Sequence, residues 1–218
     1  MNLLFDLDGT LTDPQTGITR CLVHALEQLG IAAPQPTHLR RYIGPPLRSA
    51  FAELLGTADS ALIERAVALY RERFGEVGMF ENELYPQAPA SLAELTASGH
   101  RLFVATGKAE LYAQRIVEHF GLSEYFVKVY GAALSGEGSH KRELLARLVA
   151  AEQIEPACSL MIGDRDIDVT GARANGMRSI GVLWGFGTAE ELAGANRLVR
   201  TWSELLTAVA SMDSPASP

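Results

Sequence analysis

An apolar run that ends in two carboxylates is the feature of this 218-residue chain that most constrains its fold. Residues 3–5 are Leu-Leu-Phe, and Asp6, Leu7, Asp8 and Gly9 follow directly. If the run is an extended strand, Asp6 and Asp8 point the same way while Leu7 points back into the protein. Two neighbouring carboxylates repel each other unless a cation lies between them or one of them holds a proton. The run therefore predicts a buried strand whose end carries chemistry.

The next part of the chain, residues 14–84, has a helical pattern. Apolar side chains recur there at spacings of three and four residues, in successive stripes at residues 18–29, 47–55 and 63–74. No convincing strand interrupts these stripes. We therefore expect an all-helical domain at residues 14–84.

From residue 85 onwards, short apolar runs that look like strands alternate with helical stripes. This alternation is typical of a parallel α/β sheet with right-handed connections. We predict an α/β protein: a Rossmann-like parallel-sheet core at residues 1–13 and 85–212, into which the helical domain is inserted. Residues 213–218 are rich in Ser and Pro and are predicted to be disordered.

Two Ser/Thr-x-x-Glu patterns in the core are typical of the capping boxes that open helices. One is Ser91 with Glu94, and the other is Thr188 with Glu191. Each predicts a helix start.

Polar residues follow the ends of four predicted strands, and ligands of open parallel sheets bind beyond the carboxyl ends of the strands. In chain order these residues are Asp6 and Asp8, Thr106 and Gly107, Lys141, and finally Asp164 and Asp168. If the last segment is helical, Asp164 and Asp168 share one face. Carboxylates, a lysine, a hydroxyl and backbone amides that converge on one crevice match a magnesium-assisted phosphoryl-transfer site.

The residues from Asp6 to Asp13, Asp-Leu-Asp-Gly-Thr-Leu-Thr-Asp, resemble the first motif of the haloacid dehalogenase superfamily, DxDGT(L/V)xD. Thr106, Lys141 and Gly163-Asp164…Asp168 resemble its second, third and fourth motifs, in the right order. The helical insert resembles the small cap domain of that superfamily's first subclass. Within the superfamily, residues 43–47 (Ile-Gly-Pro-Pro-Leu) and 161–165 (Met-Ile-Gly-Asp-Arg) resemble the phosphoglycolate phosphatase and 5′-nucleotidase branch.

The resemblance implies a role for each matching carboxylate. Asp6 would attack phosphorus and form an aspartyl-phosphate, and Asp8 would protonate the departing alcohol and then take a proton from water. The Asp6 carboxylate, the Asp8 backbone carbonyl and Asp164 would bind Mg²⁺. Asp168 would support Mg²⁺ binding indirectly, through those ligands or through a water.

The same resemblance implies how the phosphoryl group is held. Thr106 and the Gly107 amide would bind its oxygens, and Lys141 would neutralise charge between these oxygens and Asp6. In the helical domain, Arg41 and Arg48 flank a Gly-Pro-Pro turn and could reach a carboxylate or second phosphate of the substrate. A purely solvated role is at least as well supported for each arginine.

Two single residues bear on the other activities found in this superfamily. A dehalogenase lacks the second aspartate, so Asp8 argues against carbon–halogen chemistry. Phosphosugar mutases carry a histidine early in the first cap helix, where this chain has Ile18. We therefore expect a magnesium-dependent phosphatase for a small phosphomonoester, with phosphoglycolate and nucleoside monophosphates as candidates. A phosphosugar mutase and a catalytically silent phosphate-binding module are the alternatives.

The charge and hydropathy of the chain argue against nucleic acid polymers and membranes as partners. The formal net charge is −7, which argues against a nucleic acid polymer or an anionic membrane as a partner. No run approaches the roughly 20 apolar residues of a membrane span. We therefore expect a cytoplasmic protein whose partner is a small phosphorylated metabolite.

Overall fold

The computed structural model describes residues 1–213, which divide into two compact units. The first unit comprises residues 1–12 and the chain from residue 84 onwards, and the second comprises residues 13–83. The chain passes between them twice, through β2 (Thr12–Asp13) and β3 (Glu83–Leu84), which pair as a two-stranded sheet. β3 lies within residues 14–84, where no strand was predicted, because two residues are too few to show an alternating pattern.

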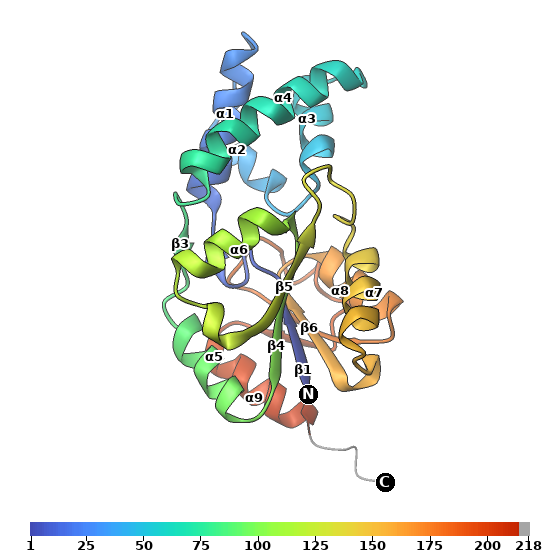
Figure 1. Cartoon of the computed structure of the whole chain (residues 1–218). Coiled ribbons are helices and arrows are strands. Elements are labelled where there is room, and N and C mark those ends of the chain that lie inside the picture. Colours follow the sequence, from blue (N-terminus) through green and yellow to red (C-terminus); the bar gives the residue numbers. More distant parts are fainter. Residues whose placement is uncertain (214–218) are drawn as a thin grey trace. The chain divides into compact units, whose positions relative to one another are not determined.

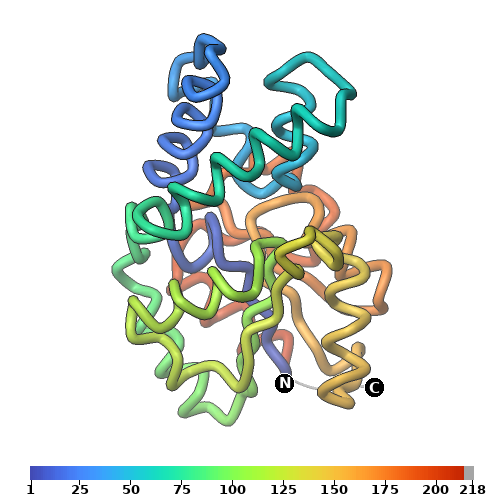
Figure 2. Tube along the Cα trace, turned by 45° about the horizontal axis from the view of Figure 1, so that its top comes forward, coloured from blue at the N-terminus to red at the C-terminus, as the bar shows by residue number. Residues whose placement is uncertain are grey.

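The first unit is built on a six-stranded sheet with the order β5-β4-β1-β6-β7-β8. All five strand pairings in this sheet are parallel, which confirms the predicted α/β fold class. Figure 2 shows the N-terminal strand, in blue, beside the green trace of β4. The strands are β1 (Asn2–Phe5), β4 (Arg101–Ala109), β5 (Phe126–Ala132), β6 (Ser159–Gly163), β7 (Arg178–Val182) and β8 (Arg197–Val199).

Helices cover both faces of this sheet (Figure 1). On one face α7 (Lys141–Glu152) packs against α8 (Asp166–Ala174), and on the other α5 (Ala88–Ala97) packs against α9 (Trp202–Asp213). The remaining helix of the sheet unit, α6 (Glu110–His119), contacts β4 and β5. No helix among residues 1–213 combines the length and the apolar character needed to span a membrane.

The central position of β1 explains its composition. Leu3, Leu4 and Phe5 are fully buried, as expected for a parallel strand with helices on both faces. Phe5 is in register with Val104 of β4 and with Ile162 of β6. The residues just after these three paired positions are therefore neighbours near the carboxyl edge of the sheet.

The second unit is helical. It contains α1 (Gln15–Gln28), α2 (Pro36–Leu39), α3 (Leu47–Leu55) and α4 (Ser60–Arg73), with 3₁₀ and π turns at Arg40–Tyr42 and Phe74–Gly78. Within this unit, α4 packs against α1 and against α3 (Figure 2). The close approach of α1 to the π turn requires glycine, since a Cβ on Gly17 would lie 1.9 Å from the Gly78 carbonyl oxygen.

Two predicted helix starts were wrong, and the predicted disordered tail lies outside the described residues except for Asp213. Ser91 lies inside α5, which begins at Ala88, so it opens no helix. The Glu191 amide does donate to Thr188 Oγ1 at 3.2 Å, but no helix follows. Asp213, predicted to begin a disordered tail, is the last residue of α9, and residues 214–218 lie outside the described residues.

Candidate active site

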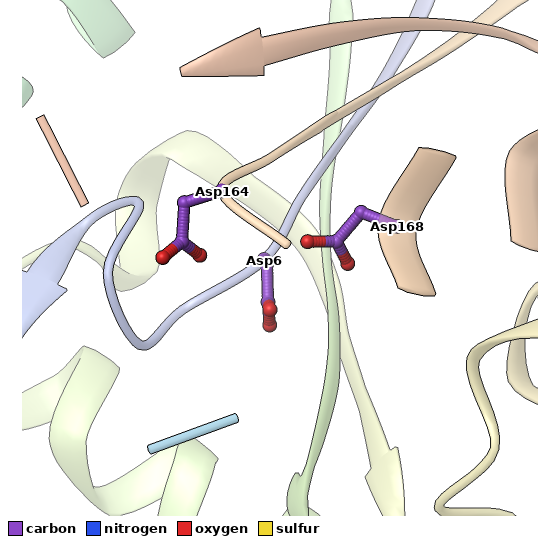
Figure 3. A group of neighbouring side chains, drawn as sticks. All are labelled: Asp6, Asp164 and Asp168. Atoms are coloured by element: carbon purple, nitrogen blue, oxygen red, sulfur yellow. The ribbon is translucent and has the colours of Figure 1, made fainter. Parts of the chain in front are cut away.

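Three predicted carboxylates meet at the carboxyl edge of the sheet. Asp6 directly follows β1, Asp164 directly follows β6, and Asp168 lies in the first turn of α8. One oxygen from each carboxylate lies within 4.8 Å of the other two, and in Figure 3 the side chains of Asp164 and Asp168 stand on either side of Asp6. All three residues are buried.

The way in which Asp164 and Asp168 meet differs from the prediction. They do not share a helical face, because α8 begins at Asp166 and Asp164 lies before it. Asp168 is instead fixed by the chain ahead of the helix, since the Arg165 amide donates to Asp168 Oδ2 at 3.1 Å. The turn between β6 and α8 thus brings both carboxylates to one place.

Lys141 is the cation of this cluster. Its Nζ lies 2.7 Å from Asp168 Oδ1 and 3.3 Å from Asp6 Oδ1, and it donates to the Ala105 carbonyl at 2.7 Å. Burial lowers the pKa of the Lys141 ammonium, but the charges of Asp168 and Asp6 outweigh burial and raise that pKa above its usual range. The start of α7 therefore delivers a fully charged lysine between two carboxylates.

Asp8 has a partner that was not predicted from the sequence. Lys108 Nζ lies 2.8 Å from Asp8 Oδ2, while Asp8 Oδ1 is buried and has no hydrogen-bond partner among the described residues. Burial raises the pKa of the Asp8 carboxyl, and the Lys108 ammonium partly opposes this rise. The signal in the sequence was the position of Lys108, two residues after the phosphate-binding candidate Thr106.

Asp164 is held by groups that the sequence analysis also missed. The Phe186 amide donates to Asp164 Oδ2 at 2.8 Å, and the Thr10 hydroxyl donates to Oδ1 at 3.4 Å. Glycines leave room for this carboxylate, because a Cβ on Gly9 or Gly185 would lie 2.2 or 2.5 Å from Asp164 Oδ2. The run of glycines after β7 was the available signal for this close approach.

Thr106 and Gly107 lie near the carboxyl end of β4, next to the end of β1. Because Phe5 is in register with Val104, Thr106 lies in β4 two residues beyond the position level with the last residue of β1. Thr106 is buried and its Oγ1 accepts from the Lys108 amide at 3.3 Å. A Cβ on Gly107 would lie 3.2 Å from the Ser139 carbonyl oxygen. Their contact with a phosphoryl group stays a prediction.

The two candidate arginines lie in the helical unit. Arg41 pairs with Glu53, and Arg48 forms a two-pronged contact with Glu64, in which Nη2 and Oε2 are 2.9 Å apart. Both guanidinium groups are thus held by carboxylates of their own unit, and a role toward a substrate stays a prediction.

The chemistry of the cluster fits a divalent cation. Burial, together with the charges of Asp168 and Asp6, raises the pKa of the Asp164 carboxyl well above its usual range. Burial also raises the pKa of Asp168 to about 6, against the opposing effect of Lys141. A single lysine does not balance three buried carboxylates, and carboxylate oxygens are the ligands that Mg²⁺ prefers. The residues present therefore suit a magnesium ion.

Comparison with known proteins places this chain in a family. Residues 3–182 match the family model described as haloacid dehalogenase-like hydrolase. A protein of Pseudomonas aeruginosa named 5′-nucleotidase is 45% identical over 88% of this chain and 86% of its own length. A phosphoglycolate phosphatase of Vibrio parahaemolyticus is 30% identical over 95% of each chain.

Other relatives extend the comparison. The tyrosine-protein kinase PtkA of Mycobacterium tuberculosis is 38% identical over 86% of this chain and 64% of its own length. The crystal structure of a predicted phosphatase from Clostridium acetobutylicum superposes with a TM-score of 0.92 at 39% identity, covering 96% of this chain and 98% of that one. The predicted family and the predicted phosphatase class are confirmed: this chain belongs to the haloacid dehalogenase-like hydrolase family.

Proposed function

We propose that this protein is a magnesium-dependent phosphatase that hydrolyses a small phosphomonoester through a phosphoryl group carried on Asp6. The observation that carries the proposal is the buried cluster in which one oxygen each of Asp6, Asp164 and Asp168 lie within 4.8 Å of one another. Lys141 supplies a positive charge that directly contacts Asp6 and Asp168 of this cluster. Such an arrangement suits a reaction in which negative charge must be gathered and held.

The metal would be held by the Asp6 carboxylate, the Asp164 carboxylate and the Asp8 backbone carbonyl. When bound, Mg²⁺ would offset the charge of these carboxylates and of the phosphoryl oxygens. Asp168 holds Lys141 in place at 2.7 Å, so it supports the nucleophile through that ammonium group.

The chain's own residues would then carry the reaction in two steps. A carboxylate oxygen of Asp6 bonds to phosphorus while the bond from phosphorus to the alcohol oxygen breaks, and Asp8 gives that oxygen a proton. Asp8 next takes a proton from a water that attacks phosphorus, which releases inorganic phosphate and restores Asp6. Thr106, the Gly107 amide and Lys141 would hold the phosphoryl oxygens during both steps.

The names of the relatives support small phosphomonoesters as substrates. One relative is named 5′-nucleotidase and another phosphoglycolate phosphatase, so nucleoside monophosphates and phosphoglycolate are the first substrates to test. A phosphosugar mutase of the same family would instead accumulate a sugar bisphosphate, and a silent binding module would release no phosphate.

The test is phosphate release from a panel of phosphorylated metabolites and p-nitrophenyl phosphate, with Mg²⁺ and then with excess chelator. We expect release with Mg²⁺, loss of release with chelator, and no release by Asp6→Asn. Asp166→Asn is the matched control, because Asp166 is an exposed carboxylate at the start of α8, close in sequence to the cluster. Wild-type turnover by Asp6→Asn contradicts the proposal.

A further inference from the structure

Lys108 and Asp8 form an ion pair that the reaction described above does not use. The ammonium lies 2.8 Å from Asp8 Oδ2, and the two side chains are 8% and 11% exposed. At this exposure the pair is only weakly screened by solvent, so it holds the Asp8 side chain more firmly than a surface pair would. Lys108 and Asp8 thus fix the orientation of each other's side chain.

The ion pair leaves the two carboxylate oxygens of Asp8 in different environments. Oδ2 is occupied by Lys108, whereas Oδ1 is buried and has no hydrogen-bond partner among residues 1–213. Burying an acceptor without a partner destabilises the protein, and a donor group of a bound substrate would supply the missing hydrogen bond. Asp8 lies two residues after the proposed nucleophile, on the same strand end. Oδ1 is therefore the Asp8 oxygen whose hydrogen bonding is left open.

Backbone geometry ties Lys108 to the phosphate-binding candidates. Between Ala105 and Ala109 the register of β4 against β5 shifts, and Lys108 lies within this irregular stretch. The Lys108 amide donates to Thr106 Oγ1 at 3.3 Å. The same short segment thus carries the proposed phosphoryl-binding hydroxyl and the ammonium that contacts Asp8.

We propose that Lys108 is a positioning residue for proton transfer by Asp8, an inference that rests on the proposed phosphatase function. Lys108 holds Oδ2 so that Oδ1 faces the oxygen of the leaving group. In the first step the Oδ1–H bond of Asp8 breaks and an O–H bond forms on that oxygen, while its bond to phosphorus breaks and Asp6 bonds to phosphorus. The Lys108 ammonium then lies beside the negative charge left on Asp8.

Leaving groups of different quality separate this role from simple substrate binding. p-Nitrophenolate departs readily without a proton, whereas phenolate is a poorer leaving group and depends more on the proton that Asp8 donates. The two aryl phosphates are otherwise similar in size and charge. The parameter kcat/KM reports steps up to the first irreversible one, so it excludes later hydrolysis of the phosphoryl-enzyme.

The experiment compares kcat/KM of wild type and Lys108→Met on p-nitrophenyl phosphate and phenyl phosphate with saturating Mg²⁺. We expect Lys108→Met to lose about tenfold more kcat/KM on phenyl phosphate than on p-nitrophenyl phosphate. Lys128→Met is the matched control, because Lys128 is an exposed lysine on β5 that lies over the Tyr130 ring, and it should leave both values unchanged.

Each outcome has a distinct meaning. If wild type releases no phosphate from either compound, the proposed function fails. If wild type is active and Lys108→Met loses the same factor of kcat/KM on both compounds, the positioning role is wrong. Lys108→Ala is measured in parallel and judged by the same ratio, so the test stands if the methionine variant does not fold.

Discussion

Single residues in the site are coupled through charge, and Lys141 shows this most directly. Its side chain is 1% exposed and its ammonium contacts Asp6, Asp168 and the Ala105 carbonyl. Removing one partner of a buried pair leaves the other charge without compensation in a medium that solvates it poorly. Lys141 is thus expected to stabilise the fold as well as to hold a phosphoryl group.

We predict that Lys141→Met lowers the free energy of unfolding by about 3–5 kcal/mol, because the Asp6 and Asp168 carboxylates lose their buried counter-charge. Urea unfolding of the metal-free protein, followed by circular dichroism, measures this change. Lys128→Met should change the free energy of unfolding by less than about 0.5 kcal/mol. A loss below about 1 kcal/mol for Lys141→Met would show that Lys141 is not buried against Asp6 and Asp168 in solution.

The site residues that could be predicted from the sequence are those whose type and order form a motif. Each of them comes after the end of a strand in the chain, and parallel topology brings those strand ends together. These residues are Asp6, Asp8, Lys141, Asp164 and Asp168. Two other partners had only indirect signals, namely the position of Lys108 after Thr106 and the glycines after β7. A lysine such as Lys108 is usually exposed, and the Phe186 amide carries no residue-type signature at all.

At the scale of elements, the segment after β7 supports the turn between β6 and α8. Glu191 Oε1 accepts from Arg165 Nε at 2.8 Å and from the Asp166 amide at 3.2 Å. These two residues directly follow Asp164, so the Glu191 carboxylate fixes the turn that carries a proposed metal ligand. The same glutamate was predicted to open a helix, and its side chain instead contacts a different segment.

Glu191→Gln should weaken Mg²⁺ binding about tenfold, because groups that orient a metal ligand typically contribute this much or more to affinity. Titration calorimetry with Mg²⁺ measures the dissociation constant without relying on turnover. Glu190→Gln is the control, since Glu190 is the exposed neighbour. Equal affinities for the two variants would mean that the turn keeps Asp164 in place without Glu191.

A second element-scale prediction concerns the helical unit. Gly17→Ala places a Cβ 1.9 Å from the Gly78 carbonyl oxygen, so α1 and the π turn must move apart. We expect this overpacking to cost about 1–3 kcal/mol of unfolding free energy. Thr16→Ala, on the exposed side of the same helix, should cost less than half as much in the same urea titration. Indistinguishable values would contradict the close packing.

Helices and strands could be predicted where their periodic pattern was long enough. The stripe at residues 18–29 lies largely within α1, and the apolar runs after residue 100 correspond to β4, β5, β6 and β7. β8 was missed because three residues of an edge strand show no pattern. Ser91 was misread because a capping pattern also occurs by chance inside a helix such as α5.

At the scale of the whole molecule, we expect the buried carboxylates to make the free energy of unfolding depend on pH and on a bound cation. The folded-state pKa of Asp168, about 6, lies above its ordinary value of 3.8, and the pKa values of Asp8 and Asp164 are raised as well. A carboxyl with a raised folded-state pKa binds its proton more tightly in the folded protein. The resulting stability is therefore present at low pH and is lost as the pH rises through the folded-state pKa.

We accordingly expect the metal-free protein to become more stable as pH falls from about 7.5 to about 5.5. Mg²⁺ should stabilise it at the higher pH, by about 2.7 kcal/mol at a hundredfold excess over Kd, and less at the lower pH because protons compete for the carboxylates. Thermal unfolding at both values, with ionic strength matched by NaCl, measures this. A Mg²⁺ shift independent of pH would argue against carboxylate ligands.

The central claim is that a phosphoryl group is carried on Asp6, and borohydride trapping during turnover tests it most directly. Borohydride reduces an acyl phosphate to the alcohol, so a phosphorylated aspartate becomes homoserine, which peptide mass spectrometry locates. The account predicts homoserine at position 6, in samples that contain both p-nitrophenyl phosphate and Mg²⁺, and none at Asp8, Asp164 or Asp168. Continued phosphate release with position 6 unmodified, or homoserine at another aspartate, would contradict it.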